Sequence, residues 1–278
     1  MAARDLPAVL VLAGHDATGG AGLVADAEAI AACGGWPLTV PTSLTVQTTR
    51  DVRRVTPASP DMMRETVQAL VEDFEIAAIK LGLIADIATL EVILEVLRRL
   101  PGVPVVCDPV LRAGGGSELA ATALPEALRE RLLPGVDLLT PNRQELERLA
   151  PQADDDTARA TELLSRGCQA VLITGTDQPA AGSDPTCVTH TLHTPELTRQ
   201  WQWPRLPGAY HGSGCTLAAA AAARLAAGER LVAACEQAQR FTWESLRHGW
   251  RPAAGQHLPR RLWQLPAAFD PEALDDRS

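Results

Sequence analysis

The sequence predicts an α/β fold, built on a central, mostly parallel β-sheet with helices on both faces. Short runs rich in leucine and β-branched residues alternate with longer segments in which apolar residues recur at helical spacing. Some of the short runs, such as 105–107, are continuously apolar, which is typical of strands covered on both faces. Strand followed by helix, repeated along the chain, indicates βα units and therefore parallel neighbours.

The individual elements follow from this alternation in order. Strands are predicted at 8–13, 38–45, 77–81, 103–107, 138–140, 170–174 and 186–192. Helices are predicted at 20–33, 60–72, 87–100, 125–132, 143–150 and 157–166. Two consecutive helices follow at 214–227 and 230–248, with Gly228 as the break between them. Residues 154–156 are three aspartates, which we interpret as a solvated loop leading into a helix N-terminus, where carboxylates suit the helix dipole.

No internal repeat and no shift in composition divides the chain, so we predict one domain over residues 1–278. The last residues, 251–278, are rich in proline and arginine and are expected to form a tail packed on the surface. Hydrophobic residues make up 46% of the chain, which is enough for a large core and argues against disorder.

The charge balance limits the classes of partner. Lys and Arg together number 25 against 34 Asp and Glu, a formal net charge of −9, and Lys80 is the sole lysine. This balance argues against nucleic acid and against an anionic membrane surface, because both need clustered positive charge. The acidic balance does not exclude a small anion bound in a locally basic pocket. No segment is long and apolar enough to span a membrane.

The six cysteines are scattered, with no C-x-x-C pair, so a zinc ribbon or a disulfide-rich secreted fold is not expected. Free thiols in a reducing compartment are the simpler interpretation. The apolar run at 8–13 is also too short for the core of a signal peptide. We therefore expect a cytoplasmic protein.

A glycine-rich segment, 13–22, directly follows the first predicted strand. Glycines at this density let the backbone approach a ligand closely and leave a helix N-terminus open. The spacing matches neither a dinucleotide-binding fingerprint nor a Walker A loop. The segment is either a ligand-binding loop or a flexible βα turn.

A second glycine-rich segment, 210–216, precedes an alanine-rich helix. Gly212 and Gly214 would let successive backbone N–H groups converge on an anion. A cysteine at a helix start is expected to have a lowered pKa, so Cys215 is a candidate base or nucleophile. The alternative is that Cys215 is a small packing residue in a tight turn.

Two further strand ends carry polar residues. Asp108 follows the strand ending at Cys107 and is a plausible ligand for Mg²⁺ or its waters, or else a turn residue. Asn142 and Glu145 follow the next strand, where Asn142 could also cap the helix. Because strand ends gather at one edge of such a sheet, the segments together predict a phosphate and magnesium site facing a glycine-rich pocket.

This combination resembles the hydroxymethylpyrimidine and phosphomethylpyrimidine kinases of thiamin biosynthesis, within the ribokinase-like superfamily. The resemblance runs in order from about residue 8 to residue 250. It rests on AGxDxxGGAGxxAD at 13–26, TSLTVQ at 42–47, KLG at 80–82, DPV at 108–110, TPNxxE at 140–145 and HGSGCT at 211–216. Most ribokinase-like sugar kinases have aspartate at the position of Cys215.

The resemblance implies a ribokinase-like fold, in a homodimer, that uses ATP and Mg²⁺ to phosphorylate a hydroxymethylpyrimidine and then its monophosphate. The implied substrate-binding residues are Gly14, Asp26, Thr45, Gln47, Leu83 and Val110. The implied nucleotide-binding residues are Asn142, Thr174 and Gly175, and the implied metal ligands are Asp108 and Glu145. The turn formed by Gly212, Ser213, Gly214 and Cys215 would hold the transferring phosphoryl group, with Cys215 near the attacking oxygen.

The sequence departs from the family at two cationic positions. Thr174 and Gly115 stand where lysines are frequent, and Arg112, beside Gly115, is a possible substitute. Guanidinium and ammonium groups are not equivalent, however. Two alternatives stand beside the kinase. One is a pyridoxal-type vitamer kinase on the same scaffold, and the other, which the two missing cations favour, is a vitamer-binding regulatory protein with weak or no kinase activity.

Overall fold

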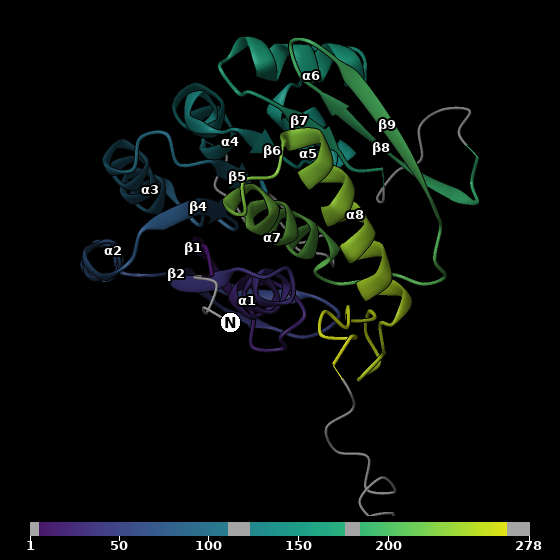
Figure 1. Cartoon of the computed structure of the whole chain (residues 1–278), viewed down its shortest axis with the longest axis horizontal. Helices are drawn as coiled ribbons and strands as arrows, with labels where there is room; N and C mark the ends of the chain where they lie inside the picture. Colours follow the sequence, from purple (N-terminus) through teal and green to yellow (C-terminus); the bar gives the residue numbers. More distant parts are fainter. Residues whose placement is uncertain (1–5, 111–122, 176–183, 266–278) are drawn as a thin grey trace, which may run out of the picture.

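The computed structural model describes residues 6–110, 123–175 and 184–265. Within them, nine strands form one sheet in the order β3-β2-β1-β4-β5-β6-β7-β8-β9 (Figure 1). The strands are β1 (Ala8–His15), β2 (Trp36–Gln47), β3 (Val52–Pro57), β4 (Ile76–Leu81), β5 (Val105–Cys107), β6 (Leu138–Leu139), β7 (Val171–Ile173), β8 (Cys187–His193) and β9 (Thr198–Pro204). The strands from β2 to β7 in this order are parallel, while β3, β8 and β9 pair antiparallel at the two edges. The predicted mostly parallel sheet is confirmed.

Helices cover both faces of the sheet (Figure 1). They are α1 (Gly22–Ala32), α2 (Pro60–Asp73), α3 (Ile87–Arg99), α4 (Leu124–Ala127), α5 (Arg143–Leu149), α6 (Asp156–Ser165), α7 (Ser213–Ala226) and α8 (Leu231–Arg247). One hydrophobic core lies between the sheet and α2 to α6, and the other between the sheet and α1, α7 and α8. Apolar runs such as β1 supply both cores: Leu10 and Leu12 belong to the first, and Val9 and Val11 to the second.

Local sequence explains several helix boundaries. The Asp155 side chain accepts a hydrogen bond from Ala158 N at 2.8 Å and so caps α6, as the aspartate run predicts. Gly228, with φ of +80°, ends α7 at the predicted break, because glycine adopts this left-handed conformation without a steric cost. The predicted helix at 125–132 is different: α4 passes into a π-helical turn, Leu128–Leu132, and a 3₁₀ turn, Leu133–Gly135.

Two strands are absent from the sequence prediction, and both lie at edges of the sheet. All six residues of β3 are at least partly exposed, and in β9 every residue is exposed except the half-buried Trp201 and Trp203. Edge strands that face water need few apolar residues, so their hydrophobic signal is weak. Arg53 and Arg54 in β3 are examples of this composition.

The predicted surface tail is only partly correct. Residues 249–261 return from the end of α8 towards the glycine-rich segments, and Trp250 and Leu258 exchange backbone hydrogen bonds there. Arg261 is 2% exposed, so this stretch contributes a buried side chain. Residues 266–278 of the predicted tail lie outside the described residues.

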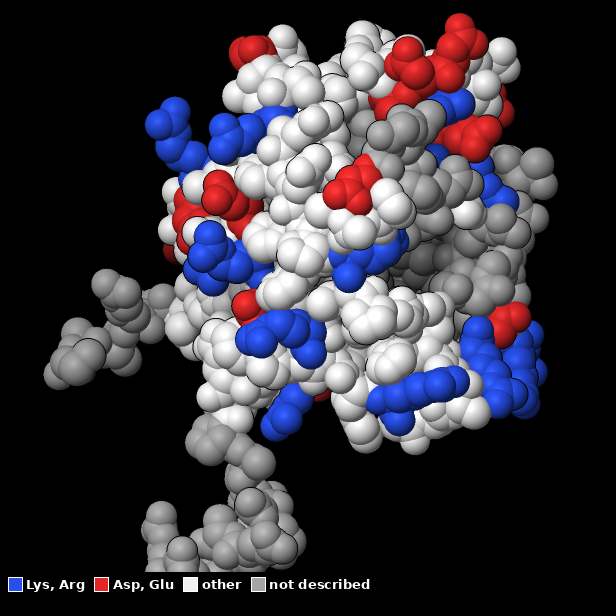
Figure 2. All heavy atoms as spheres, turned by 90° about the vertical axis from the view of Figure 1, so that its right-hand side faces the viewer, with Lys and Arg blue, Asp and Glu red and all other residues white. Residues whose placement is uncertain are grey.

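Charges are unevenly spread over the face shown in Figure 2. Acidic side chains gather at the end of the molecule that carries α6, and separate arginine clusters lie lower on the same face. In the part of the chain that the structure describes, no helix combines the length and apolar character needed to cross a membrane.

Candidate active site

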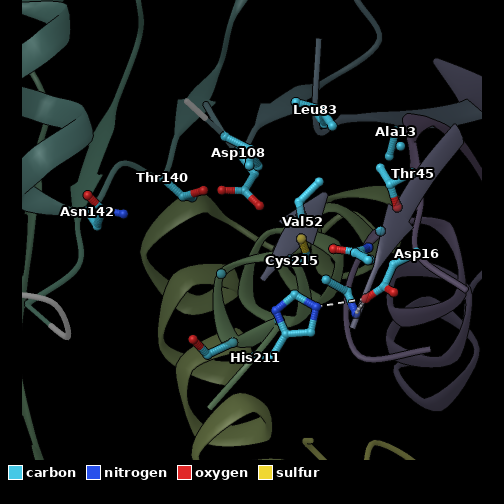
Figure 3. A pocket seen from close by; sticks show the side chains of 18 of the residues that line it. Ala13, Asp16, Thr45, Val52, Leu83, Asp108, Thr140, Asn142, His211 and Cys215 are labelled. Carbon is cyan, nitrogen blue, oxygen red and sulfur yellow. Dashed lines mark hydrogen bonds and ion pairs between the residues drawn. The ribbon is translucent and has the colours of Figure 1, made fainter. Parts of the chain in front are cut away.

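A cavity opens at the carboxyl ends of the parallel strands, where α7 begins (Figure 3). The ends of β1, β2, β4 and β5 contribute to its wall, together with the loop before α1 and the turn before α7. Ligands of open α/β sheets bind at this edge, so the cavity lies where the fold predicts it. Most of the predicted site residues line it: Gly14, Thr45, Gln47, Leu83, Asp108, Val110, Asn142, Glu145, Thr174, Gly212, Ser213, Gly214 and Cys215.

The turn before α7 presents backbone N–H groups to the cavity. Gly212 is the N-cap of α7, with φ of +84°, and a Cβ there would lie 1.8 Å from the carbonyl oxygen of Gly20. Only glycine fits both this conformation and this contact. The next three residues begin the helix, where backbone N–H groups lack acceptors within the helix. The turn therefore has the geometry of an anion-binding helix start.

Cys215 stands in this turn, and its expected low pKa is wrong. Burial raises the pKa of the Cys215 thiol, and the negative charge of Asp108 raises it further, although Lys80 acts in the opposite direction. These effects outweigh the helix dipole on which the expectation rests. Asp108 is hydrogen-bonded to the thiol, and burial raises the pKa of this carboxyl group as well. Cys215 is therefore a protonated thiol at neutral pH, next to the buried carboxyl group of Asp108.

A buried ion pair lies beneath the cavity. Lys80 Nζ donates to Asp26 Oδ2 at 2.7 Å, and both side chains are fully buried. Burial alone would lower the pKa of Lys80, but the negative charge of Asp26 raises it above its ordinary value. Burial raises the pKa of Asp26 to about 6, against the opposing charge of Lys80. The 2.7 Å contact between Nζ and Oδ2 is the geometry of an ion pair.

The predicted contact of Asp26 with substrate stays a prediction, and this pairing gives the carboxylate a further role. Lys80 lines the cavity, whereas Asp26 lies behind it and does not. The carboxylate fixes the position of the ammonium group, so Asp26 acts on the cavity through Lys80. The sequence matched Lys80 to the family motif but gave it no role.

Asp16 and His211 form a second connection that the sequence did not predict. His211 Nε2 and Asp16 Oδ2 lie 2.7 Å apart, and both residues line the cavity (Figure 3). Asp16 also accepts hydrogen bonds from the backbone N–H groups of Thr18 and Ala21, at 2.8 and 3.0 Å. Burial would raise the pKa of Asp16, but the hydrogen bonds from His211 and Thr18 hold it below its ordinary value. The pair joins the first glycine-rich loop to the turn before α7.

Asn142 and Glu145 occupy the start of α5. Asn142 Oδ1 accepts from Glu145 N at 2.9 Å, and Glu145 Oε2 accepts from Asn142 N at 3.0 Å. This capping box confirms that Asn142 caps the helix, and it holds both side chains at the cavity. Thr174 lines the same side, and its backbone N–H donates to Pro141 O at 2.9 Å.

Gly175 is not among the residues that line this cavity, and its predicted contact with the nucleotide stays a prediction. A Cβ at this position would lie 2.3 Å from the carbonyl oxygen of Thr189, so its glycine is explained by packing against β8. The loop that contains Arg112 and Gly115, where the sequence departs from the family pattern, lies outside the described residues. Lining residues that the sequence did not assign include Val52, Thr140 and Tyr210; Val52 was missed together with its strand.

Comparison with known proteins identifies related chains. Residues 16–260 match the family model described as phosphomethylpyrimidine kinase. The hydroxymethylpyrimidine/phosphomethylpyrimidine kinase of Salmonella typhimurium is 36% identical over 220 residues, which cover 77% of this chain and 81% of that protein. The chloroplastic thiamine biosynthetic bifunctional enzyme TH1 of Arabidopsis thaliana is 34% identical over 254 residues, 87% of this chain and 47% of that enzyme. This chain thus spans about half of the bifunctional relative's length.

A solved structure shows the same fold. The ADP complex of Bacillus subtilis pyridoxal kinase superposes with a TM-score of 0.84 at 24% identity, over 94% of this chain and 100% of that one. The predicted ribokinase-like architecture is confirmed by this likeness. The family model covers most of the sequence, and the Salmonella kinase is matched over most of its own length. This chain therefore belongs to the phosphomethylpyrimidine kinase family.

Proposed function

We propose that the protein is a kinase that transfers the γ-phosphoryl group of ATP to 4-amino-5-hydroxymethyl-2-methylpyrimidine and then to its monophosphate, in thiamin biosynthesis. The observation that carries the proposal is the open turn at Gly212–Cys215, which faces a small cavity with polar and apolar walls in a chain of this family.

The proposed pyrimidine site lies between β1, β2 and the segment after β4. Thr45 Oγ1 donates to His15 O at 2.8 Å, so its oxygen lone pairs are oriented to accept from an amino group. Gln47 can both donate to and accept from the edge of the ring. Leu83 and Val52 (Figure 3) supply apolar contacts for its faces, and Val110 lines the same cavity. Gly14 keeps this wall close, because a Cβ there would lie 2.9 Å from Ser43 Oγ.

The donors on the opposite side suit Mg²⁺ bound together with phosphates. Mg²⁺ is usually held by one or two carboxylates, with water and phosphate oxygens completing its shell. Asp108 and Glu145 supply two carboxylates at the cavity, and the described residues contain no larger cluster of acidic, histidine and cysteine side chains that could hold a metal alone. This donor set fits the ion. Bound there, Mg²⁺ would neutralise charge on the triphosphate and on the transferring group.

The reaction needs one bond formed, one broken and one proton moved. The hydroxymethyl oxygen bonds to the γ-phosphorus while the bond to the bridging oxygen breaks, and ADP leaves with that electron pair. The hydroxyl proton would pass to Cys215 Sγ as the thiol passes its own proton to the Asp108 oxygen to which it is hydrogen-bonded, while Asp108 would meet Mg²⁺ only through a bound water. The N–H groups of the turn and the ammonium of Lys80 stabilise negative charge on the phosphoryl oxygens.

An ADP-release assay with Mg²⁺, run separately with the alcohol and with the monophosphate, tests this function. Cys215→Ala should lower kcat by about 100-fold or more while the KM for the pyrimidine stays within about threefold, because the loss concerns proton transfer. Cys235→Ala, in the buried side of α8, is the matched control and should keep wild-type turnover. Near-wild-type turnover by Cys215→Ala would remove the thiol from the mechanism.

Two other functions are distinguished by the same assay. The fold likeness to Bacillus subtilis pyridoxal kinase favours a pyridoxal-type substrate as the second candidate. A higher kcat/KM with pyridoxal than with the hydroxymethylpyrimidine would decide for it. A vitamer-binding regulatory protein predicts no steady turnover above the Cys215→Ala background with either substrate.

We also propose that the protein is a cytoplasmic homodimer. All six cysteines are free in the structure, which supports a reducing compartment. Trp36, Leu44 and Val46 of β2 are exposed apolar side chains that an association of two copies could cover. Sedimentation equilibrium at micromolar concentration should give twice the monomer mass, and a monomer mass would contradict the dimer.

A further inference from the structure

The segment that follows α8 connects three parts of the cavity wall. His211 N donates to His257 O, and His257 N donates to Ala209 O, both at 2.9 Å, so the segment pairs with the backbone that leads into the turn. Gln256 N donates to Thr49 O at 2.9 Å and thereby contacts the β2–β3 hairpin. In Figure 1 this segment is drawn in yellow, below the end of α8. It also contains the buried Arg261.

Arg261 joins the two glycine-rich segments through its guanidinium group. Its Nε donates to Thr216 Oγ1 at 2.8 Å, in the first turn of α7. Its Nη1 donates to Gly19 O at 3.2 Å and to Glu28 Oε2 at 3.0 Å, and Nη2 donates to Gly20 O. The side chain is almost completely buried, so these contacts form in a protected environment.

The position of the Gly20 carbonyl group matters for the turn. A Cβ on Gly212 would lie 1.8 Å from this oxygen, so the two backbones are in direct contact. Arg261 holds the same oxygen through Nη2 and holds Thr216 through Nε. Thr216 Oγ1 in turn donates to Gly212 O at 2.8 Å. The guanidinium group therefore fixes the loop and the turn relative to one another.

Helix stability does not explain a cation at this place. A positive charge near a helix N-terminus opposes the helix dipole, and the partner Glu28 is partly exposed, so it compensates incompletely. The charge instead adds to the positive potential of the α7 N-terminus. It also neutralises the carbonyl oxygens of Gly19 and Gly20, which would otherwise repel an anion bound at the turn.

We propose that Arg261 is a positioning residue for phosphoryl transfer, which sets the spacing between the 19–20 loop and the Gly212–Cys215 turn and supplies positive charge behind it. This inference rests on the proposed kinase function. Arg261 lies just beyond residues 16–260, the range that matches the family model, so the match does not include it.

Steady-state kinetics of Arg261→Ala and Arg261→Lys test the proposal. Arg261→Ala should lower kcat about 10- to 100-fold, because a displaced turn no longer aligns the phosphoryl group, while the pyrimidine KM changes less than about threefold. Arg261→Lys keeps the charge but cannot hold all the acceptors at once, so an intermediate kcat is expected. Arg260→Ala is the matched control, because Arg260 is the exposed neighbour.

Chemical rescue separates positioning from a general loss of folding. Methylguanidinium at tens of millimolar should raise the kcat of Arg261→Ala at least about fivefold, while equal ionic strength from NaCl and the same addition to Arg260→Ala should have no such effect. If Arg261→Ala does not fold, the kcat of Arg261→Lys decides. A kcat within twofold of wild type in the folded variants, or a loss that methylguanidinium does not restore, would overturn the proposal.

A binding measurement distinguishes failure of this inference from failure of the kinase function. The affinity of AMP-PNP relative to ADP reports the contribution of the γ-phosphate without turnover. Wild type should prefer AMP-PNP, and Arg261→Ala should lose about five- to tenfold of that preference. If wild type prefers AMP-PNP but shows no turnover, the kinase function is wrong. The loss of that preference in Arg261→Ala would then still show that Arg261 shapes the site of the γ-phosphate. An unchanged preference in Arg261→Ala would contradict the role of Arg261.

Discussion

Replacing Lys80 by methionine should destabilise the protein strongly, because it leaves a buried carboxylate without its cation. Lys80 Nζ and Asp26 Oδ2 are 2.7 Å apart, both side chains are 0% exposed, and Asp26 Oδ1 has no other partner. Removing one member of such a pair costs about 3–5 kcal/mol. At about 2–4 °C per kcal/mol for a domain of this size, Tm should fall by about 6–20 °C.

Differential scanning calorimetry of Lys80→Met, Asp26→Leu and the double variant measures the effect. The double variant should recover most of the lost Tm, because an apolar pair of similar volume leaves no charge unpaired. Arg64→Met breaks an exposed ion pair with Glu95 and serves as the matched control, with a much smaller shift expected. A Lys80→Met variant as stable as the control would refute the reasoning.

The pH dependence gives an independent check on the same variant. Asp26 already has a folded-state pKa of about 6, above its ordinary value of 3.8, and removal of Lys80 should raise it further. Above pH 3.8 the unfolded chain releases a proton that the folded variant retains, so stability falls as pH rises. The Tm deficit of Lys80→Met relative to wild type should therefore be larger at pH 8 than at pH 5. A deficit independent of pH would contradict burial of an unpaired Asp26.

Two further outcomes follow from the glycine-rich segments. Hydrogen bonds from His211 and Thr18 lower the pKa of Asp16 in the folded state, so their stabilisation is present above pH 3.8 and is lost as pH falls through the folded pKa. The urea concentration at the unfolding midpoint should therefore fall less steeply at acid pH in Asp16→Asn than in wild type. An equally steep fall in the two proteins would contradict this role of Asp16. Gly212→Ala should lower kcat more than about 100-fold, because its Cβ collides with Gly20 O and its φ is +84°. Turnover close to wild type, measured by ADP release, would show that the turn can move.

Much of the fold could be predicted because the central strands carry their own signal. Val9 to Leu12 are apolar in succession because helices cover both faces of β1, and this pattern needs no knowledge of neighbours. The edge strand β3 contains Arg53 and Arg54 and faces water, so its pairing with β2 depends on tertiary context. Local sequence cannot report such pairing.

The features of the site likewise separate into those that local sequence shows and those that depend on distant residues. Gly212 and Asn142 were found because their conformational and capping roles are visible within a few residues. The pKa of Cys215 was missed because Asp108 and burial, which come from distant parts of the chain, outweigh the local helix dipole. The ion pair of Asp26 was not predicted because its partner Lys80 lies 54 residues away, and no local pattern shows which carboxylate pairs with this ammonium group.

The contact between Arg261 and the 19–20 loop also fixes when the site can form during synthesis. The two residues joined by Arg261 Nη1 and Gly19 O are 242 positions apart. At about 5–20 residues per second, a ribosome needs roughly 10–50 s to add that length of chain. The first glycine-rich loop must wait through this interval without its guanidinium partner, while β1 and β2 are already available to pair. A nascent chain can therefore hold much of the sheet while the turn before α7 still lacks this support, so on the proposed role of Arg261 full activity should emerge only after that residue has left the ribosome.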